Sequence, residues 1–408
     1  MQSILVVGTG FAGMWSSLSA MRLIDQNGGS KATGIQVVVV SPEPTCVIRP
    51  RLYESDASEM HASLEELFRV TSIKFVPGKV NIINTEQKNV TVIEPAGTRA
   101  LINYDRLILA AGSQLKRPAI PGLSEHAFSI DQREEAAQLE AHLRGLASQP
   151  PSLARNTVVV AGGGFTGIEI ATELPARLRS ILGPDEDVRV VVVEQAADIG
   201  PELGPGPRPV ILEALTSLGV ECRLAAAVTA VDKTGVVTSR EGDRIDSQTV
   251  IWTGGMQASP LTQQIPGKRD RFGRLQVDSS LRVLSSSTHD IFAAGDTALA
   301  VTSDQGNHAL MSCQHAIPLG RFAGHNAAAD LLAIAPKPYA QPAYGTCLDL
   351  GPWGAVVTEG WVREVRLTGS VAKAVKSNIN QAVIYPPKAD RAEAFAVADP
   401  DTPGPTLA

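Results

Sequence analysis

The sequence has few cysteines, and they are widely spaced. Four occur in 408 residues, at Cys46, Cys222, Cys313 and Cys347, with no C-x-x-C or other close pair. This spacing predicts neither a zinc site nor a redox-active disulfide. The seven histidines show no metal-ligand spacing either, so we expect no metal. Because Cys347 has no other cysteine close to it in the sequence, we expect it to be a small core residue.

The sequence also lacks an excess of basic charge and any long apolar run. Lys and Arg number 36 against 42 Asp and Glu, for a net charge of −6, which leaves no basic field for nucleic acid. No apolar run approaches the ~18 residues that cross a bilayer, and a predicted strand begins too early to leave room for a signal peptide. We expect a cytoplasmic protein of two or three domains, soluble or at most peripheral at the inner face of the membrane.

What the sequence does contain is a glycine motif directly after its first apolar run. Gly8, Gly10 and Gly13 spell G-x-G-x-x-G between a predicted strand and a predicted helix. In this context the first glycine makes a tight turn, the second admits a diphosphate, and the third lets helix and strand pack closely. The free N–H groups and the dipole at the helix N-terminus favour an anion there.

A second copy of the motif follows residues 157–161, with Gly162, Gly164 and Gly167 in the equivalent places. Both copies are followed, about thirty residues later, by four consecutive valines, at 37–40 and at 190–193. Four apolar residues in a row suit a strand that is buried on both faces of a parallel sheet. The repetition predicts two dinucleotide-binding units, against the alternative that one copy is only a packing turn.

The two copies differ at the end of the valine strand. In the second copy the valines end in Glu194, a carboxylate placed to bind the ribose hydroxyls of NAD and to repel a 2′-phosphate. NADH is therefore favoured over NADPH, although Arg189 lies nearby. The matching position in the first copy is Ser41, and Glu43 is the only carboxylate available there for a ribose.

The copies also differ in the first turn of the helix, where Glu169 takes the place of Trp15. One interpretation is a carboxylate that stabilises the helix N-terminus. The other is a contact with the nicotinamide or flavin region, which we favour because the first copy does without an acid.

Later segments resemble the two-dinucleotide-binding-domain flavoproteins of the pyridine nucleotide-disulfide oxidoreductase superfamily. A strand ends in Ala-Ala-Gly-Ser at residue 113, residues 249–256 read TVIWTGGM, and residues 290–296 read DIFAAGD. In that superfamily the last segment holds the flavin through its aspartate, here Asp296. The expected contacts to FAD or NADH are Gly8, Gly10, Phe11, Ala12, Gly13, Ser41, Glu43, Arg49, Val80, Ala111, Gly112, Gly295, Asp296, Gly162, Gly164, Gly167, Glu194 and Gly254.

Within the superfamily, the chain is most similar to the type II NADH:quinone oxidoreductases and NADH dehydrogenase-like proteins. Residues 162–169, the run from Trp252 and the segment 313–320 carry this resemblance. In the family the last segment has two glutamines near the flavin ring, where quinone docks. Gln314 fills the first position, Pro318 the second, and His315 is a further candidate to hold an acceptor carbonyl. The resemblance implies that Glu169 and Gln314 are catalytic.

The resemblance implies an α/β fold with two Rossmann-like domains and a C-terminal α+β region. Residues 1–116 and 255–330 would form an FAD domain, 117–254 an inserted NAD(H) domain, and 331–408 the C-terminal region. NADH would give a hydride to the flavin, which would pass two electrons to a quinone-like acceptor. The alternatives are an NADH-dependent reductase of a protein such as a ferredoxin or an oxygenase component, and a redox sensor without turnover. The oligomeric state stays open.

Three further segments carry weaker expectations. Pro50 should hold the run around Arg49 and Arg51 extended, either as a surface loop or along a diphosphate or flavin. Residues 362–384 are basic and apolar and form either a helix that caps the flavin domain, which we prefer, or a segment that docks on anionic lipid. From Pro386 the tail is expected to be disordered.

Overall fold

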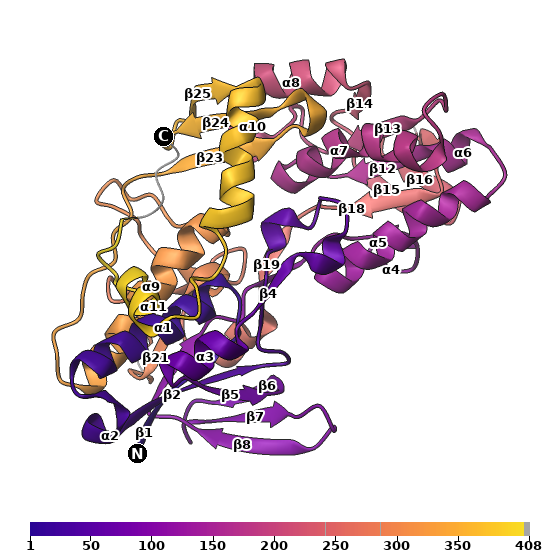
Figure 1. Cartoon of the computed structure of the whole chain (residues 1–408). Helices are drawn as coiled ribbons and strands as arrows, with labels where there is room; N and C mark the ends of the chain where they lie inside the picture. The colour runs from indigo at the N-terminus through magenta and orange to yellow at the C-terminus, as the bar shows by residue number, and fades with distance from the viewer. Residues whose placement is uncertain (241, 286, 404–408) are drawn as a thin grey trace.

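The structure is a computed structural model that describes residues 1–240, 242–285 and 287–403. Two α/β units, each built on a five-stranded sheet, lie beside a smaller C-terminal region (Figure 1). The mixed fold with two Rossmann-like units that the sequence predicts is confirmed.

The first unit is a parallel sheet with β1 at its centre. In spatial order its strands are β21 (Ile291–Ala293), β9 (Arg106–Leu109), β1 (Gln2–Val7), β2 (Ile35–Ser41) and β5 (Lys74–Pro77). All four pairings are parallel, and Val6 pairs with Val39. The four valines of β2 are buried, as expected for a strand covered on both faces. Helices α1 (Phe11–Gln26) and α9 (Cys313–Leu331) pack against each other here.

The second unit repeats this plan. Its sheet has the order β11 (Ala127–Phe128), β18 (Thr249–Trp252), β12 (Thr157–Ala161), β13 (Arg189–Val193) and β14 (Val220–Arg223), again all parallel. Helix α7 (Phe165–Leu182) follows β12 as α1 follows β1. Each unit also carries an antiparallel sheet: β6 (Lys79–Asn84), β7 (Asn89–Ile93) and β8 (Arg99–Asn103) in the first, and β15 (Val228–Asp232), β16 (Gly235–Thr238) and β17 (Arg244–Asp246) in the second.

The chain passes from the first unit to the second and returns along neighbouring strands. β10 (Ser113–Leu115) and β19 (Met256–Ala258) pair antiparallel. Because β21 and α9 come after the return, the first unit is assembled from two separate stretches of sequence. The domain boundaries at residues 116, 254 and 330 stay a prediction.

The C-terminal region is an antiparallel sheet with a helix across it. The sheet comprises β23 (Gly345–Asp349), β24 (Ala355–Glu359) and β25 (Glu364–Thr368), and α10 (Gly369–Asn378) continues into a π-helical turn, Ile379–Val383. Ala372 of α10 packs against Cys347 and Val357. The predicted helix is therefore present. Helix α10 covers this sheet, and the π-helical turn after it contacts the first unit, where Ile379 packs against the core and Asn380 donates to Glu54. Cys347 is a buried core residue, as predicted.

The basic residues of segment 362–384 have partners within the chain. Arg363 donates to the carbonyl oxygen of Glu202, and Arg366 pairs with two neighbouring glutamates. Lys373 and Lys376 bind buried carboxylates. Because these charges are already engaged, the structure does not present the segment as a free basic patch for anionic lipid.

Two expectations are wrong. Arg49–Arg51 form a 3-10 turn and not an extended run, because the fixed φ of Pro50 also suits the start of a helical turn. The tail after Pro386 contains α11 (Arg391–Val397), which is capped by Asp390 and buries Phe395; apolar residues at helical spacing outweigh the polar composition here. Residues 404–408 of the same prediction lie outside the described residues.

The remaining elements are short or peripheral. No helix within the described ranges is long and apolar enough to cross a membrane. The short or peripheral helices and strands not yet described are α2 (Gly29–Thr33), β3 (Thr45–Val47), β4 (His61–Ser63), α3 (Glu65–Thr71), α4 (Leu123–His126), α5 (Arg133–Gly145), α6 (Leu153–Asn156), α8 (Arg208–Ser217), β20 (Leu275–Gln276) and β22 (Ala298–Leu299).

Candidate functional site

The first glycine motif is closed on one side and open on the other. Gly8 has a φ of 106°, and a Cβ there would lie 2.5 Å from the carbonyl oxygen of Ala110. A Cβ at Gly13 would lie 2.0 Å from the carbonyl oxygen of Gly8, whereas one at Gly10 would have no heavy atom within 4 Å. The strand and helix are thus packed as tightly as glycine allows, and free space remains at Gly10, which fits the diphosphate of FAD.

Several of the predicted flavin residues gather beside this motif. Asp296 Oδ2 accepts a hydrogen bond from Ser113 Oγ at 2.6 Å, and Arg49 Nη1 donates to the same Ser113 Oγ at 3.1 Å. A Cβ at Gly295 would come within 2.8 Å of Ala12 Cβ, and Ala111 and Gly112 directly precede Ser113. Arg49 also pairs with Asp131, so it is a fixed side chain and not a solvated surface arginine. Its contact with FAD stays a prediction.

The residues expected near the adenosine end lie at the end of β2. Thr9 Oγ1 donates to Ser41 Oγ at 2.9 Å, which joins β2 to the glycine loop. The Glu43 side chain is 60% exposed and pairs with Arg133, while Val80 is buried in the core of the unit. Phe11 begins α1. Their contacts with the cofactor remain predictions.

The second glycine motif has the same packing. Gly162 has a φ of 119°, and a Cβ there would lie 2.7 Å from Thr253 Oγ1 and 3.2 Å from Gly254 N. A Cβ at Gly167 would lie 1.9 Å from the carbonyl oxygen of Gly162. The two motifs therefore form the same strand-turn-helix cradle.

Glu194 is held against this second cradle. Its Oε2 accepts from Gly163 N at 2.7 Å, and its Oε1 accepts from Ala196 N at 2.7 Å. The residue is 6% exposed, so two backbone N–H groups fix the carboxylate at the end of β13. A carboxylate has about four acceptor sites, which leaves capacity for the ribose hydroxyls of NADH.

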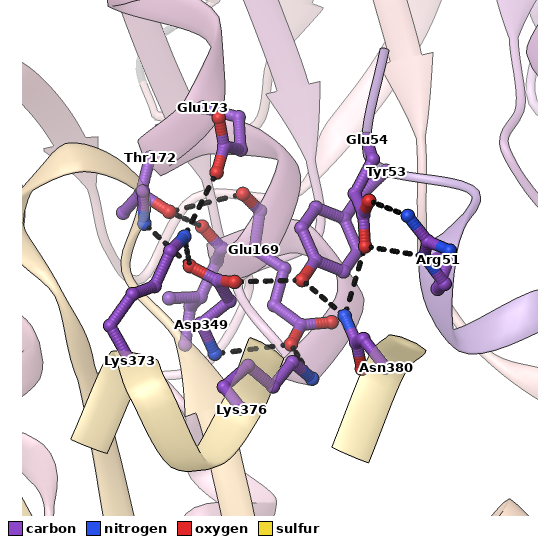
Figure 2. A network of polar contacts seen from close by, with 12 residues as sticks. Arg51, Tyr53, Glu54, Glu169, Thr172, Glu173, Asp349, Lys373, Lys376 and Asn380 are labelled. Atoms are coloured by element: carbon purple, nitrogen blue, oxygen red, sulfur yellow. Dashed lines mark hydrogen bonds and ion pairs between the residues drawn. The ribbon is translucent and has the colours of Figure 1, made fainter. Parts of the chain in front are cut away.

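Glu169 forms a buried ion pair with a lysine from the C-terminal region. Lys376 Nζ lies 2.7 Å from Glu169 Oε1, and the two side chains are 6% and 5% exposed (Figure 2). Asp349 N donates to the same Glu169 oxygen at 3.1 Å. Burial raises the pKa of Glu169 from 4.5 to about 7, although Lys376 opposes the shift. Burial lowers the pKa of Lys376, but the charge and hydrogen bond of Glu169, together with Cys347 and Asp349, raise it overall.

Further polar groups surround the Glu169–Lys376 pair. Asp349 Oδ2 accepts from Tyr53 OH at 2.8 Å, and Asp349 Oδ1 accepts from Lys373 Nζ at 2.5 Å. Lys373 also reaches Glu173, on the same helix as Glu169, and Asn380 donates to Tyr53 OH. As Figure 2 shows, the network joins both units and the C-terminal region around one carboxyl group.

Sequence reasoning missed Lys376 and Asp349. In the sequence Lys376 belongs to the basic and apolar segment 362–384, and Asp349 has no charged residue close to it along the chain. The available signal was Lys373 and Lys376 at i,i+3 spacing, which places both on one face of a helix. Nothing in the local pattern marks Glu169, which lies 207 residues away, as the partner of Lys376.

The predicted acceptor side begins at the N-terminus of α9. Pro318 cannot donate to the carbonyl oxygen of Gln314 one turn earlier, and Gln341 Nε2 donates to that oxygen at 3.1 Å instead. This orients Gln341 so that its Oε1 lies 3.0 Å from His315 Nδ1. Since a carboxamide oxygen only accepts, Nδ1 carries the imidazole proton.

His315 does not fit the role of a hydrogen-bond donor to an acceptor carbonyl. It is fully buried, and burial lowers its pKa to about 4, so the ring is neutral. Its single N–H is used by Gln341, and the ring stacks on Tyr344 at 5.5 Å and on Trp361 at 5.9 Å. Gln314 therefore remains as the candidate at this position.

Burial disfavours the thiolate form of two of the cysteines. Burial raises the pKa of Cys46 to about 12 and that of Cys313 to about 11, which keeps both as thiols. All four cysteines are free, and the part of the chain that the structure describes holds no metal-binding cluster.

Two strand-turn-helix glycine motifs on two linked parallel sheets are the arrangement of a protein with two dinucleotide-binding domains. The chain belongs to the pyridine nucleotide-disulphide oxidoreductase family, whose profile matches residues 2–320. The cofactors of this family are FAD and NADH, and its members are enzymes.

Known proteins resemble the chain over nearly its whole length. An NADH dehydrogenase-like protein of Mycobacterium tuberculosis is 43% identical over 98% of both chains. The type II NADH:quinone oxidoreductase of Staphylococcus haemolyticus is 23% identical over 94% of this chain and 95% of its own. The NDH2 of Plasmodium falciparum, solved in complex with NADH, has the same fold, with a TM-score of 0.77 at 15% identity over 97% of both chains.

Proposed function

We propose that the protein is an FAD-dependent NADH dehydrogenase that passes two electrons to a quinone-like acceptor. The single observation that carries the choice of acceptor is the buried Glu169–Lys376 pair at 2.7 Å, in which a carboxyl group with a pKa raised to about 7 is held in one position. A group of this pKa exchanges protons readily near neutral pH. The names of the Mycobacterium and Staphylococcus relatives support NADH as the donor, and the Staphylococcus name supports a quinone as the acceptor.

In this proposal the chain divides the two nucleotides between its two motifs. The first motif, with Asp296, Ser113 and Arg49, holds FAD, and the second motif, with Glu194, holds NADH. FAD, when bound, accepts a hydride from the nicotinamide and passes two electrons on. The protein contributes position, because both cradles end at helix N-termini that bind the diphosphates.

Proton balance favours a quinone over a ferredoxin. The reaction of NADH, one proton and a quinone gives NAD⁺ and a quinol, so each turnover takes up one proton from solution. NADH and two oxidised ferredoxins instead give NAD⁺, two reduced ferredoxins and one proton, so that reaction releases a proton to solution. Glu169 holds a proton below its pKa of about 7, and Lys376 fixes the carboxyl group in place. A buried carboxyl group that carries a proton near neutral pH can supply it to the first reaction, whereas the second reaction has a proton to release.

A purified sample tests the proposal in two steps. NADH is titrated anaerobically into the FAD-loaded protein, and loss of oxidised-flavin absorbance is followed; the reduced protein is then mixed with a short-chain quinone or an oxidised ferredoxin. We expect reduction by NADH and reoxidation by the quinone alone. Reoxidation by ferredoxin alone would favour the protein-partner alternative, and no reduction by NADH would favour the redox sensor.

A further inference from the structure

A carboxylate of the chain itself covers the N-terminus of α7. Glu202, in the 3-10 turn Pro201–Leu203 after β13, accepts a hydrogen bond at Oε1 from Phe165 N, the first N–H of α7, at 2.6 Å. A Cβ placed at Gly164 would lie 2.7 Å from the same oxygen. In a G-x-G-x-x-G motif this is the space left for the dinucleotide diphosphate. Glu202 therefore stands where the phosphates of NADH would bind.

The first motif has no such cover. A Cβ at Gly10, the residue equivalent to Gly164, would meet no heavy atom within 4 Å, and the first turn of α1 contains no acidic residue. Since α1 forms without a carboxylate at this end, helix stability does not explain Glu202. The difference follows the division of labour in the proposed function: the uncovered motif holds the cofactor that stays, and the covered motif holds the substrate that leaves.

The backbone around Glu202 is anchored, while its side chain is free to move. Leu203 is 2% exposed and packs into the core of the second unit. Arg363 donates to the carbonyl oxygen of Glu202, and a Cβ at Gly206 would lie 2.6 Å from the carbonyl oxygen of Arg363. Glu202 itself is exposed. Its carboxylate can thus leave Phe165 by rotation of the side chain alone.

We propose that Glu202 is a reversible latch on the NADH site that determines how tightly the nucleotide binds. A carboxylate and a diphosphate repel each other at contact distance, so the two occupy the α7 N-terminus alternately. Glu202 has to swing out before NADH binds, and it takes over the Phe165 N–H when NAD⁺ departs. This inference rests on the use of NADH in the proposed function.

The variant Glu202→Ala tests the latch by calorimetric titration of the FAD-loaded protein with NAD⁺, which binds without reducing the flavin. Removing a carboxylate from a helix N-terminus that a ligand must occupy should lower the dissociation constant by about two- to fivefold. Glu213→Ala is the matched control, because it removes the same charge from an exposed position on α8 of the same unit, and it should leave the constant unchanged. An E202A constant equal to or above that of the wild type would overturn the latch.

A phosphate-free hydride donor separates the latch from a general loosening of the site. Reduction of the flavin by 1-benzyl-1,4-dihydronicotinamide should proceed equally fast in the wild type and in E202A, because this donor places no phosphate at α7. Faster reduction of E202A by this donor would contradict the latch. If the wild type neither binds NAD⁺ nor is reduced by NADH, the proposed function is wrong. If NADH reduces the wild type normally but the wild type and E202A bind NAD⁺ with the same affinity, only the latch is wrong.

Discussion

At the scale of single residues, the chemistry of Glu169 depends strongly on its surroundings. An exposed glutamate is ionised at neutral pH, but full burial opposes the charge and brings the pKa of this one to about 7. Lys376 and Asp349 N both bind the same oxygen, so the carboxyl group is held in one position. Its protonation can therefore follow the pH of the cell while its geometry stays fixed.

Glu169→Gln should slow acceptor reduction by about 100-fold, because an amide does not ionise near neutral pH and so cannot act as a proton donor or acceptor in catalysis. In the wild type the rate of flavin reoxidation by quinone should fall as the pH rises above about 7, since the carboxyl group then loses its proton. E169Q should lack this inflection. Stopped-flow reoxidation between pH 5.5 and 9, in a series of about eight buffers, measures both effects.

Glu173→Gln is the matched control for this prediction. Glu173 lies one turn further along α7 and pairs with Lys373, so the change removes a carboxyl group close by while the Glu169–Lys376 contact stays. A pH profile of E173Q equal to that of the wild type is expected. Loss of the inflection in E173Q, or its survival in E169Q, would remove Glu169 from the mechanism.

Glu194→Gln should weaken NADH binding and relax the choice between nucleotides. The carboxylate accepts from Gly163 N and Ala196 N, and it is placed to accept from ribose hydroxyls. An amide of the same shape accepts through one oxygen only and does not repel a 2′-phosphate. We expect the KM for NADH to rise about tenfold, or roughly 1.4 kcal/mol, while the KM for NADPH rises less. An unchanged ratio of kcat/KM for the two nucleotides would contradict the ribose assignment.

At the scale of elements, substitutions at two glycines of the first motif should separate an effect on folding from an effect on cofactor binding. Gly13→Ala would place a Cβ 2.0 Å from the carbonyl oxygen of Gly8, so α1 has to move away from β1 and the protein is destabilised. Gly10→Ala meets no atom within 4 Å, and Gly10 has a φ of −63° that alanine adopts easily. We expect G10A to keep the thermal midpoint of the apoprotein and to weaken FAD by about tenfold or more. Unchanged FAD affinity in G10A would place the diphosphate elsewhere.

At the N-terminus of helix α9, Gln341 supplies the hydrogen bond that Pro318 cannot donate. Gln341→Leu leaves the Gln314 carbonyl oxygen and His315 Nδ1 without their partner, which should cost about 1–3 kcal/mol. Pro318→Ala restores a helix N–H for Gln314, so the cost of Q341L should be smaller in the P318A background. Denaturant unfolding of the four proteins in this cycle gives the coupling. Strict additivity would show that Gln341 does not replace the missing helix bond.

At the scale of the whole molecule, the C-terminal segment from Arg391 to Asp399 packs against the first unit. Arg391 pairs with Asp25 of α1 at 2.6 Å, Asp399 pairs with Arg22, and Phe395 is buried. The ion pairs alone contribute little, but burial of an aromatic side chain contributes about 1.5–3 kcal/mol. The segment therefore behaves as part of the core and not as a loose tail.

Deletion of residues 387–408 should lower the free energy of unfolding by at least about 2 kcal/mol and weaken retention of FAD. Deletion of residues 404–408 alone is the control, because it retains α11 and the partners that the structure shows for it, and it should change neither quantity. Denaturant titration and the flavin content after gel filtration measure both. Equal stability of the two deletions would mean that α11 contributes nothing to the first unit.

The sequence predicts those parts of the structure whose geometry depends on a short run of neighbouring residues. Gly8–Gly13 and Gly162–Gly167 carry their geometry locally, since a Cβ at the last glycine of either would strike the strand turn. The pairing of Glu169 with Lys376 depends on how a C-terminal sheet docks on α7, and no local pattern encodes it. Glu202 at the α7 N-terminus likewise becomes visible only in three dimensions, because an acid in a proline- and glycine-rich loop resembles any solvated charge.

The most direct test of the account follows protons and electrons together. The NADH-reduced protein is mixed anaerobically with a short-chain quinone in weak buffer that contains a pH indicator, and flavin reoxidation and proton uptake are recorded in the same stopped-flow trace. The account predicts uptake of one proton per flavin at the rate of reoxidation, with both processes slowed together in E169Q. Rapid reoxidation in E169Q, or a reduced flavin that quinone leaves unoxidised, would contradict it.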